Sequence, residues 1–257
     1  MADSKFLQVA KEAAIEAGKI VKGYYQSELE LQGKGHYTNF ATKADLESEA
    51  KVIEIIIKNF PEHNIIGEES GRVDNGSEYS WVIDPIDGTI PFVDGIPVFG
   101  VSVGLLKNSQ PFVGVINMVG AGDIYWAEEG QGAFKNGEKI QVRKQSDLEK
   151  STLALEFGHT GRDKKIENHF KPVIEKIRYA YVFGSAVRSL TLVAQGNLDG
   201  ALISAYVWDF AAGAILVLEA GGKITNQKGE EADFTLNHFE LLFSNNLIHD
   251  DLVRIYN

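Results

Sequence analysis

The sequence predicts an α/β protein, and three observations carry this prediction. Residues 4–25 place apolar side chains from Phe6 to Tyr24 at helical spacing, which is typical of an amphipathic helix. Residues 79–83 form a short apolar run of β-branched and aromatic residues, which indicates a buried strand. Several strand-like segments follow one another over residues 97–142, and such a succession favours a sheet that is mainly antiparallel.

Helices and strands can be assigned in order along the first half of the chain. A second helix is expected over residues 42–59, since Thr42 can cap its start and Pro61 stops it. Residues 32–37 contain two glycines and are expected to form a loop or hairpin. Strands are expected at 64–67, 79–83, 97–106, 112–118 and 124–127, followed by a hairpin at 134–142 in which Asn136-Gly137 favours a type I′ turn.

The second half alternates between strands and helices. The polar stretch 145–150 is the best candidate for a boundary, so we expect one catalytic unit (1–257) of two lobes, 1–145 and 146–257. Strands are expected at 152–157, 179–183, 198–204, 223–230 and 240–243, and helices at 164–176, 184–196, 208–222 and from about 246. Pro172 weakens the helix at 164–176, and the nearly all-apolar helix at 208–222 should be buried.

Composition excludes several classes of function. The net charge is 25 − 36 = −11, which opposes binding to nucleic acid polymers or to an anionic membrane. The absence of cysteine excludes disulfides, thiolate catalysis and cysteine-ligated zinc. Neither a basic-then-apolar leader nor an apolar run of membrane-spanning length is present, so a cytoplasmic enzyme is expected.

The stretch from Trp81 to Thr89 carries the strongest chemical signal. Asp84 and Asp87 end the expected strand, and Gly88-Thr89 can open a helix whose free N–H groups suit a phosphate oxygen. Two neighbouring buried carboxylates are costly without a cation, and Mg²⁺ prefers oxygen ligands completed by substrate phosphate. The stretch therefore suggests a metal and a phosphate, although an aspartate-rich turn with a capping role is the structural alternative.

Other polar groups could join this site, and each also has a structural interpretation. Asp45 lies in the first turn of a helix and Asp209 at the start of another, where aspartate commonly serves as a cap. Glu68-Glu69 follows a strand and could be a solvated loop. Ser185 opens a helix, either as a plain N-cap or to aim N–H groups at an anion.

Two motifs together resemble the inositol monophosphatase family of metal-dependent sugar phosphatases. They read WVIDPIDGT from Trp81 to Thr89 and WDFAAGAILVLEAGG from Trp208 to Gly222. Gly67 to Ser70 matches the acidic loop of the family and Thr42 to Asp45 its upstream acid, so the resemblance covers essentially the whole chain. It implies a layered αβαβα sandwich, Mg²⁺-dependent hydrolysis of phosphomonoesters, usually with lithium sensitivity, and often a homodimer.

The resemblance also implies roles, which are carried over position by position. Two or three Mg²⁺ ions would be held by Glu68, Asp84, the backbone carbonyl of Ile86, Asp87 and Asp209. Asp45 and Thr89 would orient the attacking water. Phosphate and substrate would be bound by Gly88, Thr89, Gly184, Ser185 and Ala186.

Several departures from the family pattern bear on the substrate. Leu202 stands where inositol-specific members commonly have a glutamate that grips the ring hydroxyls. Arg188 is unusual and would favour a second anionic group if it faced the site, but a surface position is the preferred interpretation. The glycines within residues 33–40 would allow a mobile lid.

Inositol 1-phosphate or a related polyol or sugar phosphate is the expected substrate. Histidinol phosphate, fructose 1,6-bisphosphate and nucleotide 3′-phosphates remain open. An aspartyl-phosphate intermediate requires two aspartates spaced by two positions, whereas Asp84 and Asp87 are spaced by three, so direct attack by metal-activated water is predicted. A catalytically silent phosphate-ester binding protein is the alternative of another class, and its signature would be a missing metal carboxylate.

Overall fold

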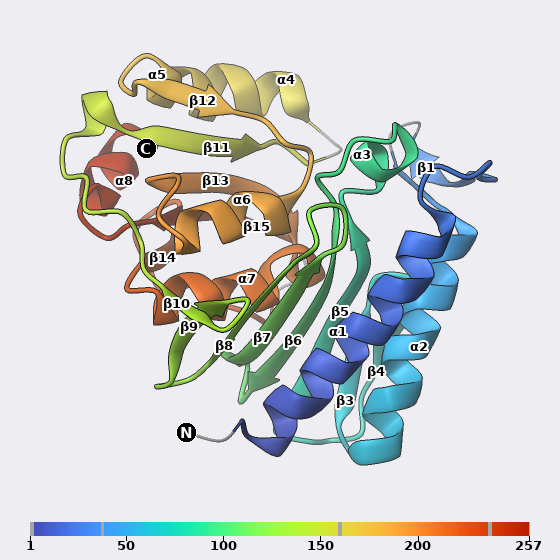
Figure 1. Cartoon of the computed structure of the whole chain (residues 1–257). Helices are drawn as coiled ribbons and strands as arrows, with labels where there is room; N and C mark the ends of the chain where they lie inside the picture. The colour runs from blue at the N-terminus through green and yellow to red at the C-terminus, as the bar shows by residue number, and fades with distance from the viewer. Residues whose placement is uncertain (1–2, 37–38, 159–160, 236–237, 257) are drawn as a thin grey trace.

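Two large β-sheets alternate with three helical layers in the computed structural model, which describes residues 3–36, 39–158, 161–235 and 238–256 (Figure 1). Helices α1 and α2 form one outer layer, α6 and α7 lie between the sheets, and α4, α5 and α8 form the other outer layer. This is the αβαβα sandwich that the resemblance implied, so that prediction is confirmed.

The bounds of the elements follow the expected order. The helical segments are α1 Lys5–Tyr24, α2 Lys43–Asn59, α3 Thr89–Val93, a 3₁₀ turn at Leu148–Lys150, α4 Arg162–Lys165, a π-helical turn at Ile166–Phe170, α5 Lys171–Ile174, α6 Ala186–Ala194, α7 Val207–Glu219 and α8 His249–Tyr256. The strands are β1 Gln32–His36, β2 Asn39–Ala41, β3 Asn64–Gly67, β4 Gly71–Val73, β5 Tyr79–Asp87, β6 Gly100–Lys107, β7 Gln110–Met118, β8 Asp123–Glu128, β9 Gly132–Lys135, β10 Glu138–Ile140, β11 Thr152–Glu156, β12 Tyr179–Tyr181, β13 Gly200–Tyr206, β14 Lys223–Asn226 and β15 His238–Ser244.

The larger sheet has the strand order β10-β9-β8-β7-β6-β5-β3-β4. It is antiparallel throughout except for the parallel pair β3 and β5, as the run of consecutive strands predicted. The apolar faces of α1 and α2 cover one side of it, and their alanines and valines pack against β5, β6 and β7. The hairpin of β9 and β10 is confirmed, since Asn136 and Gly137 both take the positive φ that its turn requires.

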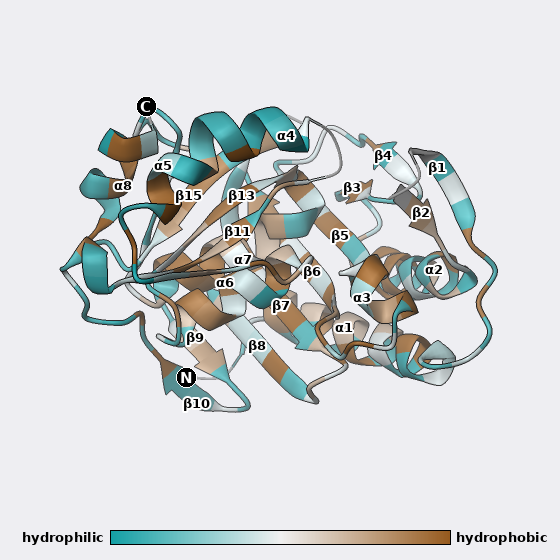
Figure 2. Cartoon of the chain, turned by 90° about the horizontal axis from the view of Figure 1, so that it is seen from above, coloured by the Kyte–Doolittle hydropathy of each residue, from teal (hydrophilic) through white to brown (hydrophobic). Residues whose placement is uncertain are grey.

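The smaller sheet has the order β12-β11-β13-β15-β14 and is mixed. Strand β11 lies parallel to both β12 and β13, whereas β15 runs antiparallel to β13 and β14. Its outer face packs against α5 and α8. The nearby helix α4 is mostly hydrophilic in Figure 2, in keeping with its place on the surface.

The core between the sheets is built around α7, the nearly all-apolar helix that the sequence placed in the interior. Helix α7 contacts β5, β6, β7 and β8 of the larger sheet, β13, β14 and β15 of the smaller sheet, and α6 beside it. The approach is so close that a Cβ at Gly114 of β7 would lie 2.4 Å from the carbonyl oxygen of Ala212. Glycine is therefore required at this crossing. The strands of the larger sheet all precede residue 146 and those of the smaller sheet all follow it, and the division of one catalytic unit into lobes 1–145 and 146–257 stays a prediction.

Two local expectations need correction. The helix expected at 164–176 is interrupted by the π-helical turn, because Pro172 has no N–H to continue the α-helical ladder. Strand β5 does not end at Ile83 but continues to Asp87 through an irregularity in its pairing with β6. The segment 33–40, whose glycines would allow a lid, lies partly outside the described residues, and the flanking segments pair as β1 and β2.

These layers bring several chain segments to one edge of the molecule. The carboxyl ends of β3, β5 and β13 meet there with the amino ends of α6 and α7, the arrangement in which α/β proteins commonly hold ligands. None of the helices in the described ranges combines the length and apolar character needed to cross a membrane.

Candidate active site

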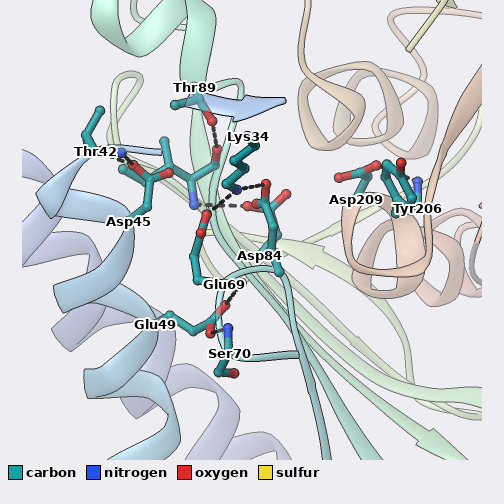
Figure 3. Close-up of polar contacts among 12 residues, drawn as sticks. Lys34, Thr42, Asp45, Glu49, Glu69, Ser70, Asp84, Thr89, Tyr206 and Asp209 are labelled. Atoms are coloured by element: carbon teal, nitrogen blue, oxygen red, sulfur yellow. Dashed lines mark hydrogen bonds and ion pairs between the residues drawn. The ribbon is translucent and has the colours of Figure 1, made fainter. Parts of the chain in front are cut away.

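Three aspartates from distant parts of the chain converge at this edge. Asp84 and Asp87 come from β5 and Asp209 from α7, and one carboxylate oxygen of each lies within 4.8 Å of the others. Asp84 and Asp87 are buried. Figure 3 shows Asp84 and Asp209 approaching each other from the two sides of the site. We call these residues the carboxylate triad.

Local backbone geometry explains why β5 can present two carboxylates at once. A regular strand would point residues three apart to opposite faces, but the pairing with β6 shifts between Asp84 and Asp87. The Oδ1 atom of Asp84 accepts a hydrogen bond of 2.9 Å from the backbone N–H of Ile86. Gly88 then takes φ = 87°, where a Cβ would also lie 2.9 Å from the carbonyl oxygen of Val98. Only glycine fits this turn.

Asp87 is fixed by the amino end of α6. Its Oδ2 accepts the backbone N–H of Ala186 at 3.1 Å, and its Oδ1 accepts that of Val187 at 3.2 Å. The Ser185 hydroxyl also donates to Oδ1. The N–H group of Ala186, which the resemblance assigned to phosphate or substrate, is therefore engaged with a carboxylate in this structure. The positive end of the helix supports the negative charge of Asp87.

Asp209 serves as both a helix cap and a member of the triad. Its Oδ2 accepts the backbone N–H of Tyr206 at 2.6 Å, which completes a capping box at the start of α7. The structural and functional interpretations of this residue are therefore compatible, because the carboxylate has capacity left for a cation.

A second acidic group lies in the turn after β3. Glu68 lines the same cavity as the triad, and the ammonium group of Lys34 lies 2.8 Å from Glu68 and 2.5 Å from Glu69. The turn is held from below by the buried Glu49 of α2, which accepts the N–H groups of Glu69 at 3.0 Å and Ser70 at 2.6 Å. Figure 3 shows this arrangement beside Asp84.

Asp45 and Thr89, the expected water-orienting pair, lie on the Asp84 side of the site, away from Asp209 (Figure 3). The Oδ2 atom of Asp45 accepts the N–H and the hydroxyl of Thr42, at 2.7 and 2.6 Å. Its buried Oδ1 has no hydrogen-bond partner among the described residues. The Thr89 hydroxyl donates to the carbonyl oxygen of Ile86 at 3.1 Å. The unpaired Oδ1 is thus available to a water or an ion.

The pKa values of the acidic groups show a shortage of positive charge. Burial, followed by repulsion from Glu68 and Asp87, raises the pKa of Asp84 well above its usual range. Burial and the charges of Asp87 and Glu68 do the same to the pKa of Asp209. Burial raises the pKa of Asp87 to about 7 despite its three hydrogen bonds, and raises that of Asp45 to about 7. Cations bound here would relieve this repulsion.

Lys34 supplies part of the missing charge. Burial alone would lower the pKa of its ammonium group, but the adjacent Glu68 and Glu69 outweigh burial and raise it. Lys34 therefore remains charged and partly neutralises the Glu68 turn without contacting the triad itself.

The site opens into a cavity of about 650 Å³. Its walls include Gly88, Thr89, Gly184, Ser185 and Ala186, the five residues expected to bind phosphate and substrate. The buried Glu156 reaches the same wall from β11 and accepts the Gly184 N–H at 3.0 Å and the Ser189 hydroxyl at 2.6 Å. Burial raises the pKa of Glu156 to about 8.

Three residues of the site were not found from the sequence. Lys34, Glu49 and Glu156 act through contacts with segments 20 or more positions away, and no local motif marks them. The glycines around Lys34 signalled a loop but not its ion pairs.

Leu202 does not occupy the substrate-binding position that the resemblance assigned to it. Leu202 is 1% exposed and packs in the core of the smaller sheet with Leu155 and Leu242. The residue of β13 that lines the cavity is Ser204, two positions nearer the end of the strand. Arg188 lines a separate groove beside β12, which agrees with its surface interpretation.

Comparisons with known proteins agree with this geometry. The model of the inositol monophosphatase family matches residues 2–256. The chain is 35% identical over 258 residues to a protein of Aquifex aeolicus named fructose-1,6-bisphosphatase/inositol-1-monophosphatase, covering 98% of this chain and 95% of that protein. It is 31% identical to the inositol-1-monophosphatase of Bacillus subtilis, covering 97% and 95%. A solved inositol monophosphatase from Anabaena has a TM-score of 0.86 and 36% identity, covering 97% and 94%.

Proposed function

The chain belongs to the inositol monophosphatase family, and is thus a phosphoric monoester hydrolase of sugar or polyol phosphates; from this premise we propose that it is Mg²⁺-dependent and acts on a substrate of the inositol 1-phosphate type. The observation that carries the proposal is the carboxylate triad, in which Asp84 and Asp87 are buried, Asp209 is half-buried, and one oxygen of each lies within 4.8 Å of the others. Such a cluster is unfavourable without cations and suits hard divalent ions.

The donor set fits Mg²⁺. The triad, Glu68 and the carbonyl oxygen of Ile86 would hold two or three ions, and all of these groups line one cavity. They are oxygen donors, and the raised pKa values of Asp84, Asp87 and Asp209 reflect burial and mutual repulsion that cations would remove. When bound, the ions would neutralise the phosphate and lower the pKa of a water molecule.

The side chains of the protein position the reactants. The unpaired Oδ1 of Asp45 would accept a hydrogen bond from the attacking water, with Thr89 beside it. A new bond would form between this water oxygen and phosphorus as the ester P–O bond breaks. The proton that the water loses would pass to solvent, and the departing alkoxide would take a proton from solvent near Asp209. The N–H groups of Gly88 and Thr89, at the start of α3, would bind phosphate oxygens.

The physiological ester is expected to be a small sugar, polyol or nucleotide phosphate. The relatives named above act on inositol monophosphate or fructose 1,6-bisphosphate according to their names. Histidinol phosphate and nucleotide 3′-phosphates remain alternatives. Ser204, which lines the cavity from β13, brings no carboxylate to grip inositol hydroxyls, so selectivity for inositol over other polyols is expected to be weak.

A homodimer is the proposed assembly, and the exposed strand β12 supports it. Tyr179, Tyr181 and Val182 are 58%, 43% and 57% exposed at the free edge of the smaller sheet. Exposed aromatic groups on an unpaired edge are unusual unless another chain covers them. Replacing Tyr179 and Tyr181 by serine should yield monomers in sedimentation velocity, and unchanged sedimentation would reject this surface. The cytoplasmic location stays a prediction that cell fractionation tests.

The function is tested by phosphate release from a panel of esters with Mg²⁺ or EDTA. The panel comprises inositol 1-phosphate, histidinol phosphate, fructose 1,6-bisphosphate and a nucleotide 3′-phosphate. We expect Mg²⁺-dependent release that Asp84→Asn lowers at least about 100-fold. Binding of the esters without turnover of any would instead favour the catalytically silent binding protein. Trapping a phosphorylated Asp84 would contradict direct attack by water.

A further inference from the structure

Glu156 is a buried carboxylate at the end of β11 to which the proposed chemistry gives no task. It is 7% exposed. Across the described ranges, no basic group lies within 4 Å of its carboxylate. Burying a carboxylate without an ion pair is unfavourable, and hydrogen bonds must offset the cost. The donors of these bonds therefore indicate what Glu156 does.

All three donors come from one short segment, residues 183–189, which we call the bridging segment. The Oε1 atom of Glu156 accepts the backbone N–H of Phe183 at 3.2 Å and the hydroxyl of Ser189 at 2.6 Å. Its Oε2 atom accepts the backbone N–H of Gly184 at 3.0 Å. Glu156 thus holds the bridging segment at both of its ends.

The middle of the bridging segment holds Asp87. Residues 185–187 give the Asp87 carboxylate one hydroxyl and two backbone N–H groups. Asp87 belongs to the larger sheet and Glu156 to the smaller one, and α6 lies between the sheets (Figure 1). The bridging segment therefore lies between two acids and spends its side-chain and backbone donors on both.

The cap of α6 does not need Glu156. Ser185 is the N-cap, and its hydroxyl oxygen already accepts the backbone N–H of Arg188 at 3.2 Å. Two of the three bonds of Glu156 go to Phe183 and Gly184, which precede the helix, and Gly184 takes φ = 68° there. Glu156 therefore fixes the turn that leads into α6, and with it the direction in which the first N–H groups of the helix point.

We propose that Glu156 is a positioning residue of the metal site: it fixes the bridging segment, and the segment holds the Asp87 carboxylate where it can bind a cation. This inference rests on the proposed function, because it takes Asp87 to be a metal ligand. Glu156 itself contacts neither the metal nor the substrate. Groups that orient a metal ligand in this way commonly change metal affinity about 10- to 100-fold.

Mg²⁺ binding, measured by isothermal titration calorimetry, tests the proposal. The measurement is made at pH 9, because burial raises the pKa of Glu156 to about 8 and the carboxyl is then mainly ionised. Glu156→Asp keeps the charge but is one methylene shorter and cannot reach all three donors, so the Kd for Mg²⁺ should rise at least about 10-fold. Glu156→Gln loses the charge but keeps the length and part of the hydrogen bonding, so its Kd should rise less.

Activity separates positioning from general damage. With the panel of esters, Glu156→Asp should need at least about 10-fold more Mg²⁺ for half-maximal turnover, while kcat at saturating Mg²⁺ stays within about 3-fold of the wild type. Glu219→Gln is the matched control, because Glu219 also accepts two backbone N–H groups, at 2.8 and 2.6 Å, but lies outside the cavity wall. It should keep the wild-type Kd for Mg²⁺.

A milder variant keeps the test valid if Glu156→Asp does not fold, which thermal unfolding shows. Ser189→Ala removes one of the three hydrogen bonds and no charge. We expect it to raise the Kd for Mg²⁺ about 3-fold, as for the loss of one hydrogen bond.

Two results would overturn this proposal alone. The first is a wild-type Kd for Mg²⁺ in Ser189→Ala and in the folded Glu156→Asp. The second is a larger rise in Glu156→Gln than in Glu156→Asp, which would assign the effect to charge instead of position. Both leave the phosphatase function standing. A wild-type chain that neither binds Mg²⁺ nor releases phosphate from any ester of the panel would reject the proposed function and this inference together.

Discussion

Asp209 offers the sharpest test of the site, because its two tasks can be separated. Asparagine at this position keeps an oxygen that can accept the Tyr206 N–H, now 2.6 Å from Oδ2, so the cap of α7 is retained. Alanine removes both the cap and the charge. We therefore expect Asp209→Ala to lose about 1 kcal/mol of stability relative to Asp209→Asn, while both variants lose Mg²⁺-dependent activity about 100-fold or more.

The effect on stability without metal has a defined sign. The folded-state pKa of Asp209 is raised by burial and by the charges of Asp87 and Glu68, so ionisation of this carboxyl destabilises the folded chain as pH rises. In EDTA, Asp209→Asn should therefore be at least as stable as the wild type, and its advantage should be larger at pH 8 than at pH 5. Urea unfolding at the two pH values measures this difference.

Mg²⁺ should reverse the order of stability. A ligand at 100 times its dissociation constant raises the free energy of unfolding by about 2.7 kcal/mol. We expect the stabilisation by Mg²⁺ to be smaller by half or more in Asp209→Asn than in the wild type. Asp233→Asn is the matched control, since Asp233 also accepts a backbone N–H but is exposed and outside the cavity wall. If Asp209→Asn keeps both the activity and the Mg²⁺-induced stabilisation of the wild type, the assignment of Asp209 to the metal site is refuted.

Three further predictions concern charges outside the triad. Burial lowers the pKa of His249 to about 4, so the free energy of unfolding of the wild type should fall by on the order of 2 kcal/mol between pH 7.5 and pH 5, a loss that His249→Gln should not show. Urea unfolding measures both proteins, and an equal dependence of their unfolding free energies on pH would contradict this prediction. Lys34→Met removes the cation between Glu68 and Glu69, so Mg²⁺ should stabilise this variant about 1 kcal/mol more than the wild type, whereas the exposed Lys43→Met should match the wild type. Glu49→Gln leaves one of the two backbone N–H groups of Glu69 and Ser70 poorly paired, so we expect the free energy of unfolding to fall by about 1–2 kcal/mol and activity to require more Mg²⁺. An unchanged Mg²⁺ titration of activity would argue against the positioning role of Glu49.

The sequence predicted the parts of the site that local patterns encode. Asp84 and Asp87 follow a buried strand and precede a glycine, and Asp209 precedes an apolar helix, so their surroundings could be read from neighbouring residues. The irregularity that turns both β5 carboxylates to one site could not be predicted, because it appears only in the pairing with β6.

Local sequence patterns could not predict which residues hold the turn after β3 or which residues of β13 line the cavity. Glu49 is an ordinary glutamate of an amphipathic helix until the turn after β3 packs above it. The sequence assigned Leu202 to the substrate site wrongly, because the spacing to a motif does not show how close a strand residue lies to the cavity. Leu202 and Ser204 share a face of β13, but only Ser204 is near enough to the strand end to line the cavity.

The way in which the fold distributes its own positive charge explains why the site needs ions. The amino end of α6 and the Ser185 hydroxyl together give Asp87 three hydrogen bonds, yet its pKa is still raised to about 7. Asp209 has one backbone donor from Tyr206, and burial and the charges of Asp87 and Glu68 raise the pKa of its carboxyl well above its usual range. Helix ends supply partial charges, which cannot offset several buried carboxylates. A site that uses these charges only to position the acids leaves their neutralisation to bound cations.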